Sequence, residues 1–399
     1  MNKNCLLMLV VLIVMAALAA CNPASLTTSP VSTPDSPLPS STPLPSLTWT
    51  STAEPSPTPT ETPVPTPTET PVPTPVPLYT AGVWECWDRG QSVPCPYDAS
   101  LSLKQMTFVS DTEAWAVGGN GYIARWDGYT WTRVESPTDK GLNDVFFLSP
   151  DNGWAVGEGG LILRWDGRGW SVAREPQSHL PPGGYYPIWN GIAFSSPDDG
   201  WVVGCIDSEG GSTLKAMHWN GKDWQDSTMP IIWTSYCLES VKILSSQDVW
   251  AVGGGFQGIT LHWDGFRWQE IPNPFSSRTS PPAWFYAINA SSPDNVWIAG
   301  LRASDDGGTE GIVLHWDGEQ WLDGHLPPTE WVLAVWVISE SAGWVGGDDL
   351  FHWNGQEWDK AANPVFDRIV DIASSPNGEI WARTQHGAYL HLQSKEGVR

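Results

Sequence analysis

Aromatic side chains occur in the irregular stretches of this sequence, where they could bind a ligand by stacking on it. Seven of them lie outside the repeated positions described below: Tyr185, Tyr186, Trp233, Tyr236, Trp284, Tyr286 and Trp331. Few charged residues flank them, and this combination suits the face of a sugar ring or an apolar protein surface. Our hypothesis is that they line a concave binding surface. The alternative is that they plug the connecting loops onto the core.

Two further aromatic residues in the same stretches have a different interpretation. Trp189 and Phe285 align with Leu142, Leu238 and Val332 of other repeats. Because an apolar residue recurs at this position, we predict that Trp189 and Phe285 belong to the core.

Histidines at one repeat position could suggest a metal centre. They are His218, His262, His315, His352 and His391. Each belongs to a different repeat, so a ring of repeats would spread them apart, and we predict no metal site and no cofactor. The acidic pairs Asp305-Asp306 and Asp348-Asp349 could hold calcium weakly, but solvated turns are the interpretation we prefer.

Catalysis has little support in the pattern of residues. The sequence contains no evident nucleophile–base pair and no phosphate-binding loop. A sialidase-like site would need three arginines, an acid and a tyrosine at one place, and only Arg368 lies at the start of a predicted inner strand. A glycan-active hydrolase or lyase therefore remains an alternative function.

The elements that position these residues form a repeat of seven units. Its best marker is a Trp followed by small apolar residues, and the spacing between markers runs from 37 to 49 residues. The marker tryptophans are Trp115, Trp154, Trp201, Trp250, Trp297, Trp344 and, in degenerate form, Trp381. This spacing is typical of propeller blades rather than short solenoid repeats.

Each unit shows four strand signals, a to d. Strand b carries the marker, strand c ends in a second Trp, and strand d begins with a third, as in Trp154, Trp165 and Trp170. Asp-Gly or Asn-Gly stands between strands c and d, which predicts a two-residue type I′ hairpin. The repeated tryptophans are expected to fill the core between sheets.

The predicted fold is an all-β, seven-bladed propeller of four-stranded antiparallel blades. Seven strands of types a, b and c stand against six of type d, so one blade lacks its outer strand. Residues 82–87, with Trp84 and Trp87, have the right character to supply it. Antiparallel order places the variable b–c and d–a loops at one end, where binding loops on a rigid scaffold would lie.

Four cysteines of the repeat region suggest disulfides: Cys86, Cys95, Cys205 and Cys237. An even count in an exported protein favours two bonds, and three pairings are possible. Pairing Cys86 with Cys95 would close a local loop, and pairing Cys205 with Cys237 would join two neighbouring repeats.

The N-terminal part divides into a signal and a spacer. Lys3 and the apolar run from Leu6 to Leu18 are typical of a signal peptide at residues 1–20, and Leu18-Ala-Ala-Cys21 resembles a bacterial lipobox, which implies lipidation of Cys21. Residues 21–78 are rich in Pro, Thr and Ser, with the unit TPTETPVP at 58–65 and 66–73. This composition predicts a semi-rigid stalk before a propeller domain at 79–395.

The charge of the chain limits its partners. With 20 Lys and Arg against 44 Asp and Glu, the net charge is −24. Such an acidic chain is a poor partner for nucleic acid or for anionic lipid surfaces. We expect a monomer that is exported and lipid-anchored on the outer side of a bacterial membrane, at the cell surface.

The repeat also resembles known propeller families. Gly-Gly after strand b resembles the Kelch repeat, and Trp-Ala-Val-Gly followed by Gly-x-Ile or Gly-x-Leu is similar to Asp-box (BNR) propellers of the photosystem assembly-factor type. The resemblance covers about residues 83–393 and implies a propeller. The leading hypothesis is a surface lipoprotein that presents a binding platform for glycan or protein. By resemblance, an assembly or scaffold factor for a membrane complex is the second alternative.

The lipobox leads to a direct test of the anchor. We expect that Cys21→Ala leaves the chain uncleaved or releases it from the membrane, because the thiol that accepts lipid is gone. Fractionation of membranes and metabolic labelling with a fatty acid measure both effects. Recovery of labelled variant in the membrane fraction would overturn the assignment of Cys21.

Overall fold

The computed structural model describes residues 83–98, 100–175, 186–206, 211–232, 236–255, 257–277 and 280–393. All of them belong to one compact unit, Pro73–Arg399. Within these ranges the chain is all-β, with a single 3₁₀ turn at Glu158–Gly160, and no helix there is long and apolar enough to span a bilayer. The predicted signal peptide, Cys21 and the stalk at 21–78 lie outside the described residues.

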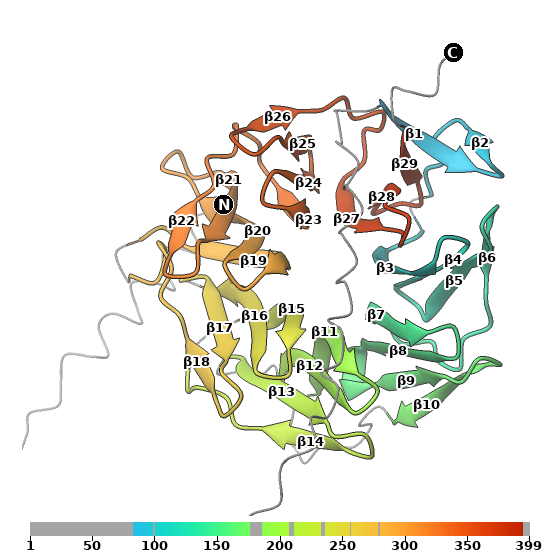
Figure 1. Cartoon of the computed structure of the whole chain (residues 1–399), viewed down its shortest axis with the longest axis horizontal. Coiled ribbons are helices and arrows are strands. Elements are labelled where there is room, and N and C mark those ends of the chain that lie inside the picture. Colours follow the sequence, from blue (N-terminus) through green and yellow to red (C-terminus); the bar gives the residue numbers. More distant parts are fainter. Residues whose placement is uncertain are drawn as a thin grey trace, which may run out of the picture. The chain divides into compact units, whose positions relative to one another are not determined.

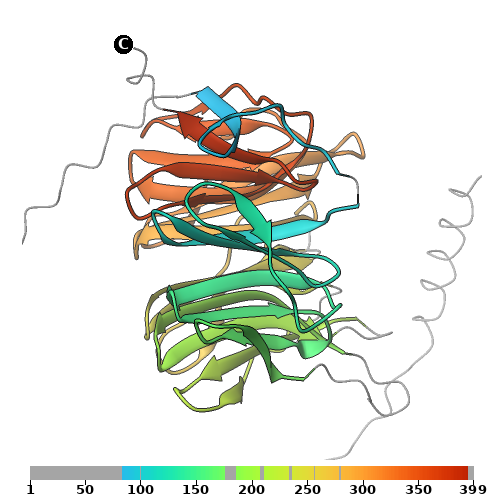
Figure 2. The same cartoon turned by 90° about the vertical axis from the view of Figure 1, so that its right-hand side faces the viewer.

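The described strands form antiparallel sheets arranged around a common centre (Figure 1), and in side view they stand as successive layers (Figure 2). Four sheets have four strands each: β3 (Leu103–Ser110), β4 (Glu113–Gly118), β5 (Tyr122–Trp126) and β6 (Trp131–Arg133); β7 (Leu142–Ser149), β8 (Asn152–Gly157), β9 (Ile162–Trp165) and β10 (Trp170–Arg174); β11 (Pro187–Ser196), β12 (Asp199–Ile206), β13 (Thr213–Trp219) and β14 (Trp224–Ser227); β23 (Val332–Ser339), β24 (Ala342–Gly347), β25 (Leu350–Trp353) and β26 (Trp358–Lys360).

Two larger sheets complete the arrangement. One has five strands: β27 (Ile369–Ser374), β28 (Ile380–Thr384), β29 (Tyr389–Gln393), β1 (Val83–Asp88) and β2 (Gln91–Ser92). The other has eight: β15 (Leu238–Ser245), β16 (Asp248–Gly255), β17 (Ile259–Trp263), β18 (Trp268–Glu270), β19 (Ala283–Ser292), β20 (Asn295–Ala303), β21 (Thr309–Trp316) and β22 (Trp321–Asp323). The fold is therefore a propeller of four-stranded antiparallel units.

The sequence predicts seven blades, whereas the described strands form six sheets. Two repeats share the eight-stranded sheet, where Gly254 and Gly255 at the end of β16 pair with Trp284 and Ala283 of β19. A Cβ atom at Gly254 would lie 2.7 Å from the Trp284 ring, so only glycine allows this approach. The two halves, β15–β18 and β19–β22, each keep the four-strand order of the other sheets.

Interlocked tryptophans join neighbouring sheets. Trp115 of β4 packs against both Trp165 and Trp170 of the next sheet, with ring centroids 4.7 and 5.6 Å away, and those two rings are themselves 5.7 Å apart. The same arrangement recurs for Trp154 with Trp219 and Trp224, Trp201 with Trp263 and Trp268, Trp250 with Trp316 and Trp321, and Trp297 with Trp353 and Trp358. The central Trp of each group is at most 3% exposed. The expectation that repeat tryptophans form the core is confirmed.

The N-terminal strand β1 completes the last sheet, as predicted from the strand count. It pairs antiparallel with β29, Trp84 opposite Leu392 and Cys86 opposite Leu390 (Figure 1). The Trp84 ring is 2% exposed and meets Trp344 edge-on at 5.2 Å. Strand-d tryptophans meet strand-b tryptophans in the same way elsewhere, so Trp84 takes the place of the missing strand-d Trp.

The disulfide pairing left open by the sequence is decided by the structure. Cys86 bonds Cys95, and Cys205 bonds Cys237, with Cα atoms 5.1 and 4.9 Å apart. The first closes the loop around β2. The second joins β12 to the residue before β15, and so connects two neighbouring repeats.

The turns between strands c and d differ from the predicted type I′ hairpin. Trp126 pairs with Trp131, so the connection has four residues, and of its first two only Gly128 has positive φ, at 88°. Oδ1 of Asp127 accepts the N–H groups two and three residues further on, at 3.0 and 2.9 Å. The carboxylate thus organises a turn for which the Asp-Gly pattern predicts backbone conformation alone.

Loss of β1 should destabilise the whole domain, because it exposes Trp84 and opens the edge of β29. A chain that starts at residue 100 should melt about 10 °C or more below one that starts at residue 79, since burial of one Trp alone stabilises by about 3–5 kcal/mol. Calorimetry of both chains measures the difference. Equal melting temperatures would show that β1 does not contribute to the domain.

Candidate functional site

The innermost strand of each repeat has a β-bulge at the same position. In β3, for example, the register shifts between Leu103 and Gln105, which leaves Lys104 as the extra residue. A bulged residue has no partner in the ladder, and its side chain is turned away from the regular alternation. The extra residues are Lys104, Asn143, Asn190, Glu239, Tyr286, Leu333 and Val370.

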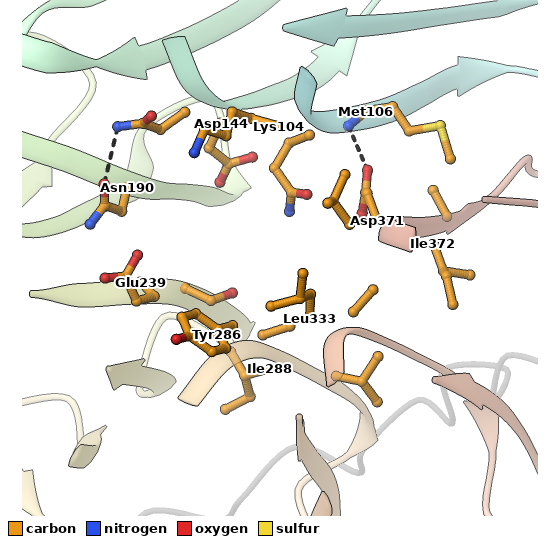
Figure 3. A pocket seen from close by; sticks show the side chains of 18 of the residues that line it. Lys104, Met106, Asp144, Asn190, Glu239, Tyr286, Ile288, Leu333, Asp371 and Ile372 are labelled. Atoms are coloured by element: carbon orange, nitrogen blue, oxygen red, sulfur yellow. Dashed lines mark hydrogen bonds between the residues drawn. The ribbon is translucent and has the colours of Figure 1, made fainter. Parts of the chain in front are cut away.

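These seven residues line a central cavity of about 540 Å³. Its walls are the innermost strands β3, β7, β11, β15, β19, β23 and β27. Figure 3 shows Asn190, Glu239, Tyr286 and Leu333 around this space, each on its own strand. One side of the ring is polar and the opposite side, at Leu333 and Val370, is apolar.

Carboxylates in the cavity wall join neighbouring inner strands. Oδ2 of Asp371 accepts the N–H of Met106 at 2.6 Å, and Oδ2 of Asp144 accepts the N–H of Ile192 at 2.7 Å (Figure 3 shows the first). In each case the donor lies on the innermost strand of the next sheet. Both carboxylates therefore hold the ring together and are not available as free acids.

Burial changes the ionisation of these two groups. It raises the pKa of Asp144 to about 8, against the opposing effect of the two N–H groups it accepts, from Ile192 and Val145. It raises the pKa of Asp371 to about 6, and there the nearby Arg383 guanidinium opposes it most. The protonated form of each is thus favoured by folding.

Glu239 and Tyr286 form a second titratable group at the cavity. Burial raises the pKa of Glu239 to about 7, while Lys104 lowers it. Burial and the negative charge of Glu239 raise the pKa of Tyr286 to about 12. Among the described residues, none makes a hydrogen bond or ion pair with the Glu239 carboxylate, so it is free to meet a ligand.

Two of the predicted ligand-binding residues meet at this cavity. The Tyr286 ring stacks on the Trp331 ring with centroids 6.3 Å apart and planes at 25°. The Arg368 guanidinium lies 4.4 Å from the Trp331 centroid, and its Nε donates to Asp348 at 2.7 Å. An aromatic pair with a cation on one face can bind an apolar, flat or anionic group.

Tyr186, Tyr236 and Trp284 are not among the residues that line this cavity. Tyr236 meets Trp284 edge-on at 6.0 Å and is 40% exposed, and Tyr186, before β11, is 45% exposed. Tyr185 and Trp233 lie outside the described residues. The expectation that Trp284 and Tyr286 belong to a loop is wrong, since β19 begins at Ala283.

The expected core aromatics and histidines are found where the repeat predicts them. Trp189 and Phe285 are 2% and 0% exposed, which confirms their assignment to the core. The repeated histidines each lie on the strand-b Trp of their own repeat, at 4.3–4.7 Å between ring centroids: His218, His262, His315, His352 and His391. In the part of the chain that the structure describes, no three His, Cys, Asp or Glu side chains could share a metal ion.

Sequence reasoning missed the polar residues of the cavity, Lys104, Asn143, Asn190 and Glu239. A signal for them was present. Each directly follows the aligned core position of its strand, as Asn143 follows Leu142. Only the bulge at that position turns such a residue into the cavity.

Comparison with known proteins supports the fold. The family model described as "Photosynthesis system II assembly factor YCF48" matches residues 88–166. The solved structure "YCF48 bound to D1 peptide" is 18% identical, covers 80% of this chain and 100% of its own, and has a TM-score of 0.56. The structure "YCF48 from Cyanidioschyzon merolae" is 16% identical, covers 78% of this chain and 98% of its own, and has a TM-score of 0.54.

Proteins of other activities share the architecture. A streptogramin B lyase structure is 14% identical, covers 78% of this chain and 98% of its own, and has a TM-score of 0.55. No curated protein sequence matches the chain. Together the family model and the solved structures show a BNR-type β-propeller, and such low identities establish the fold alone.

The raised pKa of Asp144 predicts a pH-dependent stability. Its folded pKa of about 8 exceeds the unfolded value near 4, so folding takes up a proton between these limits, and its contribution falls as the pH rises from about 5 to 8. Asp144→Asn has no such titration. The melting temperature of the wild type minus that of the variant should therefore be larger at about pH 5 than at about pH 8.

Differential scanning calorimetry across this range checks the prediction, with Asp151→Asn as the control because Asp151 is exposed in a turn. The melting temperature of that control should change with pH in the same way as the melting temperature of the wild type. A constant difference between wild type and Asp144→Asn would mean that Asp144 stays ionised throughout.

Proposed function

We propose that this chain is a binding propeller whose cavity mouth holds an extended segment of a partner protein. Counting the two halves of the eight-stranded sheet separately, we infer seven blades around the cavity. The observation that carries the proposal is the stack of Tyr286 on Trp331, with the Arg368 guanidinium over the Trp331 ring, beside the polar bulge residues, which together form the mouth.

The chemistry of the mouth fits a peptide. Stacked rings supply the rigid apolar area that dominates binding energy at protein interfaces. The amide NH₂ of Asn143 donates to Trp189 and Asn190, and that of Asn190 donates to the backbone carbonyl of Leu238. Oδ1 of Asn143 and the Glu239 carboxylate remain to accept N–H groups of an extended backbone. Exposed Tyr186 and Tyr236 lie outside the cavity and would extend the contact over neighbouring loops.

The comparisons favour a protein ligand over a carbohydrate. One similar structure is a propeller with a bound D1 peptide, so this fold accommodates a peptide. An assembly or scaffold factor for a membrane complex is one form that such a function would take. Carbohydrate is the competing ligand, since aromatic rings beside amides and a carboxylate also suit sugars.

The arrangement of acids favours binding over glycan hydrolysis. Glycoside hydrolysis commonly needs a general acid and a second carboxylate across the scissile bond. Asp144 and Asp371 are committed to backbone N–H groups of neighbouring strands, which leaves Glu239 without a second free carboxylate among the described cavity residues.

The N-terminal segments suit a role at the membrane. We propose that Cys21 carries lipid on the outer side of a bacterial membrane and that residues 22–78 hold a monomeric propeller away from it. A lipid anchor would leave the whole loop face free for a partner.

Arrays of peptides and of glycans, probed with the full-length chain, test the ligand class. We expect capture by peptides, with Trp331→Ala and Tyr286→Ala each weakening it about 30-fold, which corresponds to roughly 2 kcal/mol for a central aromatic residue. Phe266→Ala is the matched control, because Phe266 is 87% exposed on a turn between strands c and d and should not affect binding. Binding to glycans alone would overturn the peptide proposal.

Thermal melts of the same variants separate binding from folding. Trp154→Ala, which removes an interlocked Trp, should cost about 3–5 kcal/mol of unfolding free energy. Trp331→Ala and Tyr286→Ala should cost much less. If they are as unstable as Trp154→Ala, the two rings are core residues and the mouth loses its role.

A further inference from the structure

A lysine lies deeper in the cavity than the residues of the mouth. Lys242 follows Glu239 by three residues on β15, which places it about 10 Å further along the channel. It is half-buried and lines the same cavity. Burial lowers the pKa of its ammonium group, because removal from water disfavours the charged form.

The ammonium group of Lys242 has no counter-ion among the described residues. Within the described ranges, Lys242 makes no ion pair and no hydrogen bond, and its Nζ contacts the Trp336 ring at 5.8 Å from the centroid. Trp336 belongs to β23, and β19 stands between β23 and β15 in the order of inner strands. The side chain therefore reaches past the neighbouring inner strand, across the channel.

The other groups at this depth are donors and apolar walls. Asn289 accepts the N–H of Val337 through Oδ1, and its Nδ2 has no acceptor among the described residues. Phe146 and Trp336 supply aromatic surface to the same cavity. The cavity acids are engaged elsewhere, since Asp144 and Asp371 accept backbone N–H groups and Glu239 lies at the mouth.

An ammonium without a counter-ion in such a place is costly, because a half-buried charge loses part of its hydration and the Trp336 ring replaces little of it. A bound anion would offset that cost. One ammonium offsets one negative charge, and a net charge of −24 disfavours polyvalent anions. The aromatic walls favour a ligand with an apolar body.

We propose that the inner channel binds a small organic carboxylate, with its carboxylate on Lys242 Nζ and Asn289 Nδ2 and its apolar body against Trp336 and Phe146. The cavity of about 540 Å³ has the size of ordinary small-molecule sites. This site lies deeper in the same cavity than the mouth residues, and the proposal does not depend on peptide binding there.

4-Fluorophenylacetate is the probe for this site, followed by fluorine NMR with the full-length chain. The wild type should bind it with a Kd in the millimolar range or tighter, and Lys242→Met should weaken binding at least about tenfold. The neutral 4-fluorophenylacetamide should bind at least about tenfold more weakly than the acid. Lys215→Met is the matched control, because Lys215 is also half-buried but lies on β13, outside the lining of the cavity, and it should change binding less than about twofold.

A second arm distinguishes a free acid from a carboxylate carried by a chain. A pentapeptide that ends in Phe with a free carboxylate is compared with its C-terminal amide. Binding of 4-fluorophenylacetate but not of the peptide acid assigns the site to small molecules. Binding of both 4-fluorophenylacetate and the peptide acid, with both lost in Lys242→Met, assigns the site to carboxylates from either source.

Melting temperatures give an independent readout. Without ligand, Lys242→Met should melt above the wild type, because the uncompensated charge is gone. Added 4-fluorophenylacetate should raise the melting temperature of the wild type and not of the variant. Equal binding of acid and amide, unchanged binding by Lys242→Met, or no binding of any acid at about 10 mM would overturn the proposal. If Lys242→Met melts below the wild type and binds 4-fluorophenylacetate equally well, Lys242 is a packing residue.

Discussion

The packing of one Trp against a contacting pair of tryptophans of the next sheet is the interaction on which this fold depends. Each repeat supplies a ring from strand b to one interface and rings from strands c and d to the other. A four-stranded twisted sheet cannot bury both faces by itself, so the repeats are stable only together. Closure follows from the same rule, since Trp84 of β1 supplies to Trp344 the ring that the last repeat lacks.

This interlocking fixes the outer strands and leaves the innermost strands free to present side chains to the channel. The bulge at one position of every inner strand uses that freedom, because the residue after each buried core position no longer packs between sheets. The channel residues therefore vary from Lys104 to Glu239 to Leu333 while the rest of the repeat stays constant. Specificity is confined to a ring of side chains on a uniform scaffold.

The channel contains basic as well as acidic side chains, although the whole chain is strongly acidic. The protein carries a net charge of −24, yet two of the buried carboxylates in the channel wall accept backbone N–H groups that join neighbouring strands. In the described part of the chain Lys242 has no counter-ion, and the charge of Glu239 acts on Tyr286. Acids thus stabilise the ring, while the unpaired groups are those that a ligand can reach.

Local chemistry was sufficient to predict the repeat, its strands, the Trp core and the pairing of β1 with the last repeat, because periodicity and strand count depend only on neighbours along the chain. It was not sufficient for the turns after strand c, where the Asp127 side chain replaces a positive φ, or for the joining of two repeats through Gly254 and Trp284. The candidate site shows the same division. Tyr286 and Trp331 were recognisable as aromatics outside the repeat, but their stacking, the inward turn of Glu239 and the isolation of Lys242 arise only when strands far apart in sequence close around one axis.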